Sequence, residues 1–344
     1  MCSAQFAHSD PGHTLLGLEQ VIGGAAAIRA SSEVGVLGLL TNRRATPRQV
    51  ADTLGLREQA ARRLLDALAA LGLASRGPDG RYTSQVEEQV PFEGFLEMWD
   101  SLPGVLRDGP TSLRLDRPAD AQRFYPGLVG LLGEMMAEAA RRAAERLARP
   151  GLRVLDVGAG AAPWSLAILA REPSCRVTAL DLPRVIPVTR QTVEAWGAND
   201  RFEYVAADLF QAGLQADAFD LAMVGNVCHL FSPVDNRRLL SRLSGTLRPG
   251  GTVAIIDTLS DGQETREQAI YALGLLLRAP EGDVYPVSRY TEWLVDTGYQ
   301  AVEAARLTSR PEGYVFSDPS RSHCFVFVDQ ATEDIDPANE WHLG

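Results

Sequence analysis

Residues 154–164, VLDVGAGAAPW, decide the fold. An apolar run that fits a buried strand ends at Asp156, and small residues then continue almost without interruption to Trp164. Small residues in a turn between a strand and a helix allow a ligand to approach the backbone closely. Because an acid precedes the first glycine, Gly158, by two residues, the ligand has to suit a negative charge at this turn.

Further strand-like runs follow this turn and alternate with helical stretches. From residue 152 they read RVLDVG, RVTALD, FEYVAAD, FDLAMVGN and TVAIIDTL, and AVEAARL and HCFVFVD close the series. Strands separated by helices predict right-handed crossovers and a mostly parallel, doubly wound sheet. We therefore expect an α/β, Rossmann-like sheet of seven strands, in which the last two are antiparallel and joined by a loop at 308–320.

The N-terminal part follows another pattern. Thr46 precedes a helix that begins at Pro47, Gly55 ends that helix, and leucines at helical spacing lead to a turn at 78–80 between two short runs. Helix, turn, helix and hairpin are typical of a winged helix. We expect a flexible N-terminus at 1–13, a winged-helix domain that is all-helical apart from this hairpin at 14–90, a helical connector at 91–150, the sheet domain at 151–330 and an acidic tail at 331–344.

Composition and charge restrict the classes of function. The 344 residues are 45% hydrophobic and 22% charged, which is ordinary for a globular protein. A net charge of −11, with no lysine in the chain, argues against general binding of nucleic-acid phosphates. The four cysteines form no CxxC pair, and neither a signal peptide nor a run that could span a membrane is present, so we expect a reduced, cytoplasmic chain. The five histidines are dispersed, and we expect no metal.

The glycine turn discriminates between nucleotide cofactors. From Gly158 the pattern is G-x-G-x-x-P, which lacks the third glycine of a dinucleotide site, and Asp156 would repel a pyrophosphate. A P-loop needs a lysine that this chain lacks. S-adenosylmethionine carries a sulfonium cation and no phosphate, so an acid beside the turn attracts it. Asp181 ends the next strand, where an acid grips ribose hydroxyls, and Asp208 ends the third, within reach of an adenine amino group.

The segments VLDVGAGAAPWSLAI, ALDLPRV, FEYVAADLF and NVCHLFSPVDNRRLLSRLSGTLRPGGTVAIIDTL resemble class I S-adenosylmethionine-dependent methyltransferases. More narrowly, residues 14–330 resemble the small-molecule O-methyltransferases with an N-terminal winged-helix dimerisation domain. The resemblance implies a domain-swapped homodimer, S-adenosylhomocysteine as a product, and a cleft roofed by the middle helices for a small aromatic or enolic acceptor. It implies cofactor contacts at Gly158, Gly160, Asp181, Leu182, Asp208, Leu209 and Phe210, to which we add Asp156 and Asn226.

The resemblance also implies a general base. The family carries it in a segment of the type N-x-x-H-D-W, and His229 in VGNVCHLFSP falls on that histidine, although Leu230 and Phe231 replace the following Asp and Trp. Asp257, at the end of the fifth strand, matches an acid that orients the histidine. A second orienting acid is expected near 284, where the sequence reads EGDVYPVSRY. We expect His229 to act as the base with Asp257 as its partner.

Other side chains near these segments receive simpler assignments. We interpret Cys228 as a packing residue, because neighbours on an extended segment point to opposite faces. The stretch 271–277 is interpreted as an inserted helix that covers the cleft or the dimer seam. Four side chains are candidates for the wall of the acceptor pocket: Trp99, Phe124, Tyr125 and Met135.

Several functions remain open on the sequence alone. A phenolate or enolate can be methylated on oxygen or on its ortho or alpha carbon, so C-methylation is the alternative to the favoured O-methylation. A further alternative is a protein that binds the cofactor and no longer transfers the methyl group. A transcriptional regulator would need a basic winged helix, and the candidate recognition stretch at 57–66 has only a small surplus of arginine.

Overall fold

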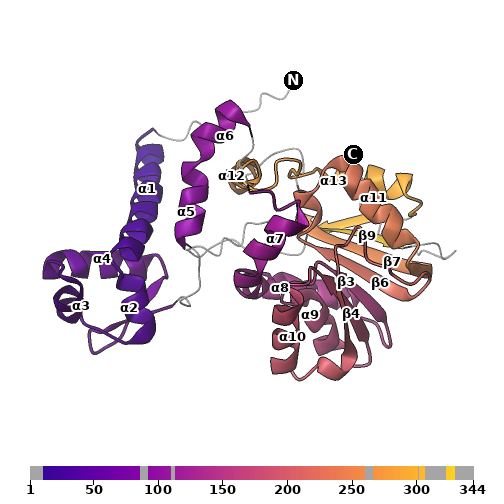
Figure 1. Ribbon diagram of the computed structural model, residues 1–344, viewed down its shortest axis with the longest axis horizontal. Coiled ribbons are helices and arrows are strands. Elements are labelled where there is room, and N and C mark those ends of the chain that lie inside the picture. The colour runs from indigo at the N-terminus through magenta and orange to yellow at the C-terminus, as the bar shows by residue number, and fades with distance from the viewer. Residues whose placement is uncertain are drawn as a thin grey trace. The chain divides into compact units, whose positions relative to one another are not determined.

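A computed structural model of the chain describes residues 11–85, 92–109, 113–259, 266–300, 302–306 and 323–329 (Figure 1). The predicted N-terminus up to residue 10, the loop at 308–320 and the acidic tail at 331–344 lie outside the described residues. The chain divides into two compact units, with the boundary between Asp100 and Ser101. No helix in these ranges is long and apolar enough to cross a membrane.

The first unit combines helices with a small hairpin. Its elements are α1 (Pro11–Glu33), α2 (Val36–Asn42), α3 (Pro47–Leu54), α4 (Glu58–Ala70), β1 (Ala74–Arg76), β2 (Tyr82–Ser84) and α5 (Phe92–Asp100). Thr46 begins α3 with a capping box, in which its side chain accepts from the Gln49 amide and the Gln49 side chain accepts from the Thr46 amide. Gly55 ends α3 in the left-handed conformation at φ 68°. The predicted order of helix, turn, helix and hairpin is present in this unit.

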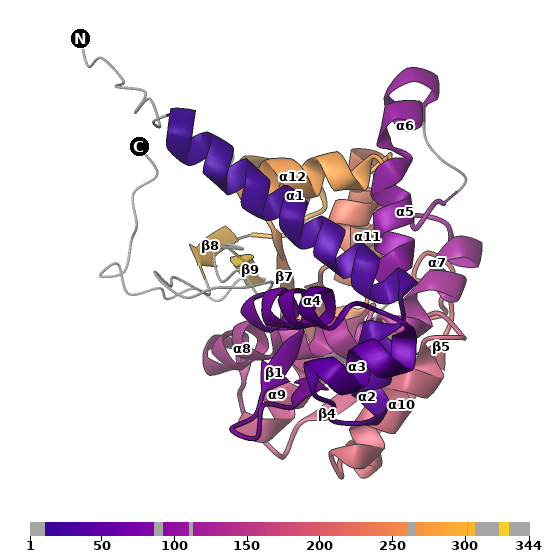
Figure 2. The same cartoon turned by 90° about the vertical axis from the view of Figure 1, so that its left-hand side faces the viewer.

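The core of this unit explains why α5 belongs to it. Leu40, Leu65 and Leu68 are fully buried among α2, α4 and the hairpin. Both α4 and α5 pack against the long helix α1 (Figure 2). The sequence places residues 91–150 in one connector, whereas the structure assigns α5 to the N-terminal unit and the rest of that stretch to the second unit.

The second unit is built around one sheet. Helical elements precede it: α6 (Leu102–Asp108), α7 (Pro118–Phe124), the 3₁₀ turn η1 (Tyr125–Gly127) and α8 (Val129–Leu147). The sheet and its crossovers follow as β3 (Arg153–Val157), α9 (Pro163–Arg171), β4 (Arg176–Asp181), α10 (Ile186–Ala195), η2 (Asn199–Arg201), β5 (Phe202–Ala206), β6 (Phe219–Gly225), η3 (Cys228–Leu230), α11 (Pro233–Ser244) and β7 (Leu247–Thr258). The last elements are α12 (Arg266–Leu275), α13 (Val287–Asp296), β8 (Val302–Arg306) and β9 (His323–Asp329).

The sheet has the order β5-β4-β3-β6-β7-β9-β8. The strands from β5 to β7 in this order are parallel, and β9 is antiparallel to both β7 and β8. The predicted seven-stranded, doubly wound α/β sheet is therefore confirmed, including its antiparallel closing pair.

Helices cover both faces of the sheet (Figure 1). On one face, α8, α9 and α10 contribute Met136, Trp164 and Val193 to a buried cluster. On the other face, α11 and α13 contribute Leu240 and Trp293 to a second cluster. Because apolar side chains on both faces are buried, the central strands are nearly continuous hydrophobic runs, as their sequences indicate.

The order of the strands locates a candidate site. From β3 the chain proceeds outward through β4 to β5 and then returns to β6 on the other side of β3. At such a reversal the two crossovers leave in opposite directions and open a crevice beyond the carboxyl ends of the strands. Here the crevice is expected beyond Val157 of β3 and Gly225 of β6.

Candidate active site

The glycine turn after β3 is held against the end of β4. The amides of Gly158 and Ala159 both donate to the Leu180 carbonyl, at 2.8 and 3.2 Å. Gly158 has φ +69°, and a Cβ there would lie 2.6 Å from Cγ2 of Val227. Gly160 has φ +55° and donates its amide to Oδ2 of Asp181 at 2.7 Å. Both positions therefore need glycine, one of them because of close packing as well as conformation.

Two carboxylates flank this turn. Asp181 accepts from the amides of Gly160 and Leu182, each at 2.7 Å, and its burial raises its pKa to about 6. Asp208 accepts from the Phe210 amide through Oδ1 at 2.9 Å. Because a carboxylate oxygen can accept two hydrogen bonds, both acids retain acceptor capacity toward a ligand.

The third predicted acid has a different environment. Asp156 is fully buried, accepts from the Ser165 hydroxyl at 2.5 Å, and does not line the cleft described below. Burial raises its pKa to about 6. The expectation that Asp156 faces the cofactor is not met, because the side chain points into the core of β3 and α9, where it supports the turn from behind.

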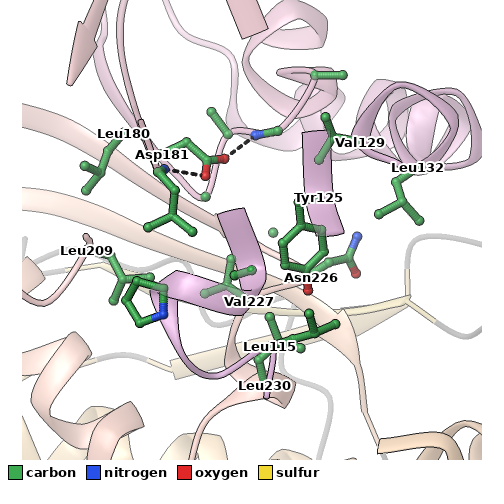
Figure 3. Close-up of a pocket in the computed structure, with 18 of the residues that line it drawn as sticks. Leu115, Tyr125, Val129, Leu132, Leu180, Asp181, Leu209, Asn226, Val227 and Leu230 are labelled. Carbon is green, nitrogen blue, oxygen red and sulfur yellow. Dashed lines mark hydrogen bonds between the residues drawn. The ribbon is translucent and has the colours of Figure 1, made fainter. Parts of the chain in front are cut away.

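A cleft of about 990 Å³ opens over these strand ends (Figure 3). All the predicted cofactor residues except Asp156 line it: Gly158, Gly160, Asp181, Leu182, Asp208, Leu209, Phe210 and Asn226. Its remaining wall is mostly apolar and includes Leu115, Tyr125, Val129, Leu132, Met136, Leu230 and Phe231. A mostly apolar wall with a few converging polar groups is typical of a site for a small organic ligand.

Asn226 occupies an unusual backbone position at the edge of β6. Its φ is +56°, which asparagine tolerates better than most residues, and its amide donates to the Ile256 carbonyl at 2.7 Å. Asn226 and Tyr125 both line the cleft (Figure 3). The segment that leads to His229 therefore leaves the sheet through a fixed turn.

His229 is held by a buried carboxylate. Its Nδ1 lies 2.6 Å from Oδ1 of Asp257, and its amide donates to Oδ2 of the same residue at 3.0 Å. His229 is 5% exposed, Asp257 is fully buried, and neither lines the cleft. With Nδ1–H donating to the carboxylate, Nε2 carries a lone pair that can accept a proton.

The Nε2 atom has a partner that the sequence analysis did not identify. The hydroxyl of Tyr271, from α12, lies 2.9 Å from Nε2 of His229, and the two rings meet edge to face with centroids 5.4 Å apart. The stretch 271–277 is predicted as a covering helix, and α12 does include its first part. No spacing in the sequence indicates that Tyr271 meets His229, since 42 residues separate them.

The stretch expected to hold a second orienting acid packs on the backbone of His229 instead. A Cβ on Gly282 would lie 2.0 Å from the His229 carbonyl oxygen. Of its acids, Glu281 lies 3.5 Å from Arg114, and Asp283 accepts from the Val284 amide at 2.8 Å. In the described residues the second contact to the imidazole is therefore a tyrosine hydroxyl, and the carboxylates near 284 point elsewhere.

The predicted pocket wall is only partly assembled in this unit. Tyr125 lines the cleft, whereas Phe124 packs edge to face against it at 5.7 Å and does not line the cleft. Met135 is 39% exposed, and its neighbour Met136 lines the cleft instead, because adjacent residues of α8 point about 100° apart. Trp99 lies on α5 and belongs to the N-terminal unit.

Cys228 is a packing residue, as the sequence predicts. Cys228 is fully buried, as a packing residue should be, and burial raises the pKa of its thiol. It lies in the 3₁₀ turn η3, and the extended segment assumed from the sequence is not present. In the ranges that the structure describes, no three His, Cys, Asp or Glu side chains gather where they could hold a metal ion.

Comparisons with known proteins agree with the fold. Residues 132–300 match the family model described as an O-methyltransferase domain. A 3-hydroxy-5-methyl-1-naphthoate 3-O-methyltransferase of Streptomyces sahachiroi is 28% identical over 310 residues, which cover 82% of this chain and 88% of that protein. An L-tyrosine C(3)-methyltransferase of Streptomyces lavendulae is 25% identical over 322 residues, 82% of this chain and 86% of that protein.

Solved structures are similar over nearly the whole chain. The mitomycin 7-O-methyltransferase MmcR aligns with a TM-score of 0.70 and 22% identity, and the alignment covers 93% of this chain and 98% of that one. Human N-acetylserotonin methyltransferase, solved in complex with SAM, aligns with a TM-score of 0.68 and 19% identity over 96% of this chain and all of that one. At these identities the structural similarity establishes the fold.

Proposed function

We infer that this chain belongs to the O-methyltransferase family of class I S-adenosylmethionine-dependent enzymes, and on that premise we propose that it methylates a phenolic or enolic hydroxyl of a small natural-product intermediate. The observation that carries the proposal is the pair Asp181 and Asp208, which flank a glycine turn at the switch point of the sheet and face one cleft.

The residues of the cleft fit S-adenosylmethionine. Asp181 would accept from the ribose hydroxyls and Asp208 from the adenine amino group, since both keep free acceptor capacity. Gly158 and Gly160 leave the backbone open to the methionyl part. Two carboxylates and no lysine disfavour a phosphate-bearing nucleotide at the same place. When bound, S-adenosylmethionine supplies an electrophilic methyl group on a sulfonium.

His229 supplies the base in this proposal. A phenol with a pKa of about 10 costs roughly 4 kcal/mol to ionise at pH 7, and a base that takes its proton lowers that cost. The Asp257 carboxylate fixes the imidazole with Nε2 as the proton acceptor and stabilises the imidazolium that forms. Both residues are buried, so their charges interact more strongly than they would in water.

The apolar end of the cleft supports an aromatic acceptor. Leu115, Val129 and Leu132 form a wall against which a flat ring can pack beside Tyr125. The relatives that act on a naphthoate and on L-tyrosine, by their names, are methyltransferases of aromatic compounds. We therefore propose an aromatic hydroxy compound as the acceptor.

C-methylation is the second candidate, favoured by the relative named L-tyrosine C(3)-methyltransferase. The same phenolate is nucleophilic at oxygen and at the ortho carbon, and a base at His229 serves both outcomes. The position of the ring relative to the methyl group would select between them.

We also propose that the functional form is a homodimer through the N-terminal unit. Leu18, Val21 and Ile22 on α1 are 49%, 55% and 67% exposed, which is unusual for a run of large apolar side chains. Light scattering on the purified chain should give twice the mass of the 37.2 kDa monomer. A monomer at micromolar concentration would contradict this part of the proposal.

The test of the main proposal uses S-adenosylmethionine labelled with ¹³C in its methyl group. The purified chain is incubated with 3-hydroxy-5-methyl-1-naphthoate, L-tyrosine and related hydroxy aromatics, and the product methyl carbon is observed by NMR. A methoxy resonance with wild type, lost in His229→Ala, supports O-methylation, and an aryl-methyl resonance supports the second candidate. Tight cofactor binding with no labelled product from any acceptor would contradict both.

A further inference from the structure

We propose that Tyr271 relays the proton of the acceptor hydroxyl to His229. The Tyr271 hydroxyl lies within hydrogen-bond distance of Nε2 of His229, whereas Asp257 is bound to Nδ1 on the other side of the imidazole. This inference rests on the proposed function. It makes Tyr271 a catalytic residue that touches the acceptor, while His229 stores the proton one step away.

Tyr271 is more accessible than His229. His229 is 5% exposed, and both of its ring nitrogens have partners, Asp257 at 2.6 Å and Tyr271 at 2.9 Å. Tyr271 is only half-buried, so it is the outer member of this chain of contacts. An acceptor can approach Tyr271 without displacing the imidazole, whereas direct contact with Nε2 would require breaking a buried hydrogen bond.

Tyr271 does not itself line the cleft, but it lies close to Tyr125, a residue of the cleft wall. Tyr271 and Tyr125 both pack against the hydrophobic core on the same face of the sheet, and Tyr125 lines the cleft. The pKa of Tyr125 is raised chiefly by burial and then by the neighbouring Tyr271 hydroxyl. The electrostatic effect of Tyr271 on Tyr125 places the two hydroxyls near each other.

Several contacts fix the ring of Tyr271 and the chain around it. The Arg278 guanidinium carbon lies 4.9 Å from the centre of the ring, a cation–π contact. The carbonyl of Arg278 accepts from the amide of Leu115, a residue of the cleft wall, at 2.6 Å. At the other end of α12, the Gln268 side chain donates to the Leu259 carbonyl. The cation–π contact holds the ring, and the two hydrogen bonds fix the chain before and after it.

The proposed step moves two protons before the methyl group is transferred. The O–H bond of the acceptor breaks and its proton passes to the Tyr271 oxygen, while the Tyr271 O–H bond breaks and its proton passes to Nε2 of His229. Tyr271 ends neutral, and His229 ends as an imidazolium paired with Asp257. The acceptor oxygen then forms a bond to the methyl carbon, and the electron pair of the broken C–S bond stays on sulfur. The stored proton leaves to solvent after product release.

The experiment compares wild type, Tyr271→Phe and the matched control Tyr299→Phe. Tyr299 also donates one buried hydroxyl to a protein acceptor, the Leu240 carbonyl at 3.2 Å, and lies outside the cleft lining. Formation of S-adenosylhomocysteine is measured with 3-hydroxy-5-methyl-1-naphthoate and with a nitro-substituted analogue whose phenol is already ionised at the assay pH. The ¹⁵N resonances of His229 are recorded in the same proteins without ligand.

The relay predicts that Tyr271→Phe lowers kcat for the naphthoate at least 100-fold with KM changed less than about threefold, while Tyr299→Phe stays within threefold of wild type. The loss should fall below threefold with the ionised analogue, because no proton then has to move. The Nε2 resonance of His229 should shift in Tyr271→Phe alone.

Three results would overturn the relay, two of them kinetic and one spectroscopic. An equal fall in kcat with both acceptors would mean that the Tyr271 hydroxyl has only a structural role. Unchanged or faster turnover of the naphthoate by Tyr271→Phe would mean that the hydroxyl blocks Nε2 of His229 until the acceptor displaces it. A wild-type chain that methylates neither acceptor would count against the proposed function. An unmoved Nε2 resonance would count against the relay itself.

Discussion

Replacing Asp257 with asparagine tests how the buried carboxylate supports His229. Asp257 accepts from three donors in the structure: Nδ1 of His229, the His229 amide and the Thr258 amide at 2.8 Å. Asparagine has nearly the same shape and keeps one oxygen for the backbone amides. It removes the charge, and its amide group can donate to Nδ1, which would leave the proton on Nε2 and no lone pair there.

The magnitude follows from the geometry. His229 becomes a cation when it takes a proton, and its charge then lies about 4 Å from that of Asp257, which is worth roughly 4 kcal/mol at an effective dielectric constant of 20. Since 1.36 kcal/mol is a factor of ten, losing most of this attraction in the transition state predicts a fall in kcat of about 10²–10³-fold. Binding of S-adenosylhomocysteine should change little, because Asp257 does not line the cleft.

The assay measures kcat and KM for an aromatic acceptor over pH 6–9, with cofactor affinity and melting temperature recorded for the same protein. Asp220→Asn is the matched control, because Asp220 lies at the start of β6, away from the cleft, and pairs with Arg248 at 2.9 Å. Turnover of Asp257→Asn within threefold of the Asp220→Asn control would refute the reasoning, since the imidazole would then need no carboxylate.

Two further predictions concern packing and charge burial. In Gly225→Ala the new Cβ would lie 2.1 Å from Nε1 of the buried Trp164, so we expect the free energy of unfolding to fall by about 1–3 kcal/mol. The control is Gly245→Ala, whose Cβ would meet its nearest atom at 3.6 Å and should lower the free energy of unfolding by less than about 0.5 kcal/mol. Equal denaturant midpoints for the two variants would contradict this prediction. Burial raises the pKa of Asp156 from 3.8 to about 6, so the folded state binds this proton more tightly than the unfolded state does. The protonated carboxyl therefore stabilises the fold below pH 4, and this stabilisation is lost as the pH rises through 6. The unfolding free energy of Asp156→Asn minus that of wild type should therefore rise by about 3 kcal/mol between pH 4 and pH 8, as measured by urea titrations. A difference that does not change with pH would show that ionising the buried carboxylate does not destabilise the fold.

Much of the fold could be predicted because it rests on local patterns. Gly158 and Gly160 predict the turn after β3. The alternation of strands with helices predicts a doubly wound sheet, because crossovers between parallel strands are right-handed. Asp181 and Asp208 could be placed at one edge of the sheet because parallel strands end on the same side. The capping box at Thr46 depends on residues only three apart.

Long-range contacts could not be predicted in this way. Whether a strand-end acid faces the cleft or the core depends on which helix covers it, and Asp156 turns toward Ser165 of α9. The contact of Tyr271 with His229 joins α12 to η3 across 42 residues, and no periodicity carries that information. Trp99 lies on α5 of the N-terminal unit, and its place in the acceptor pocket stays a prediction.

The central claim is that Asp181 and Asp208 form a site for the adenosyl part of S-adenosylmethionine. Titration calorimetry of S-adenosylhomocysteine, which keeps that part, into the purified chain tests it most directly. We expect one site per chain, no heat with NAD, and an affinity about 10–100-fold weaker in Asp208→Ala, which removes one hydrogen-bonding charge from the cleft. Binding of NAD in place of S-adenosylhomocysteine, or an Asp208→Ala protein with unchanged affinity, would contradict it.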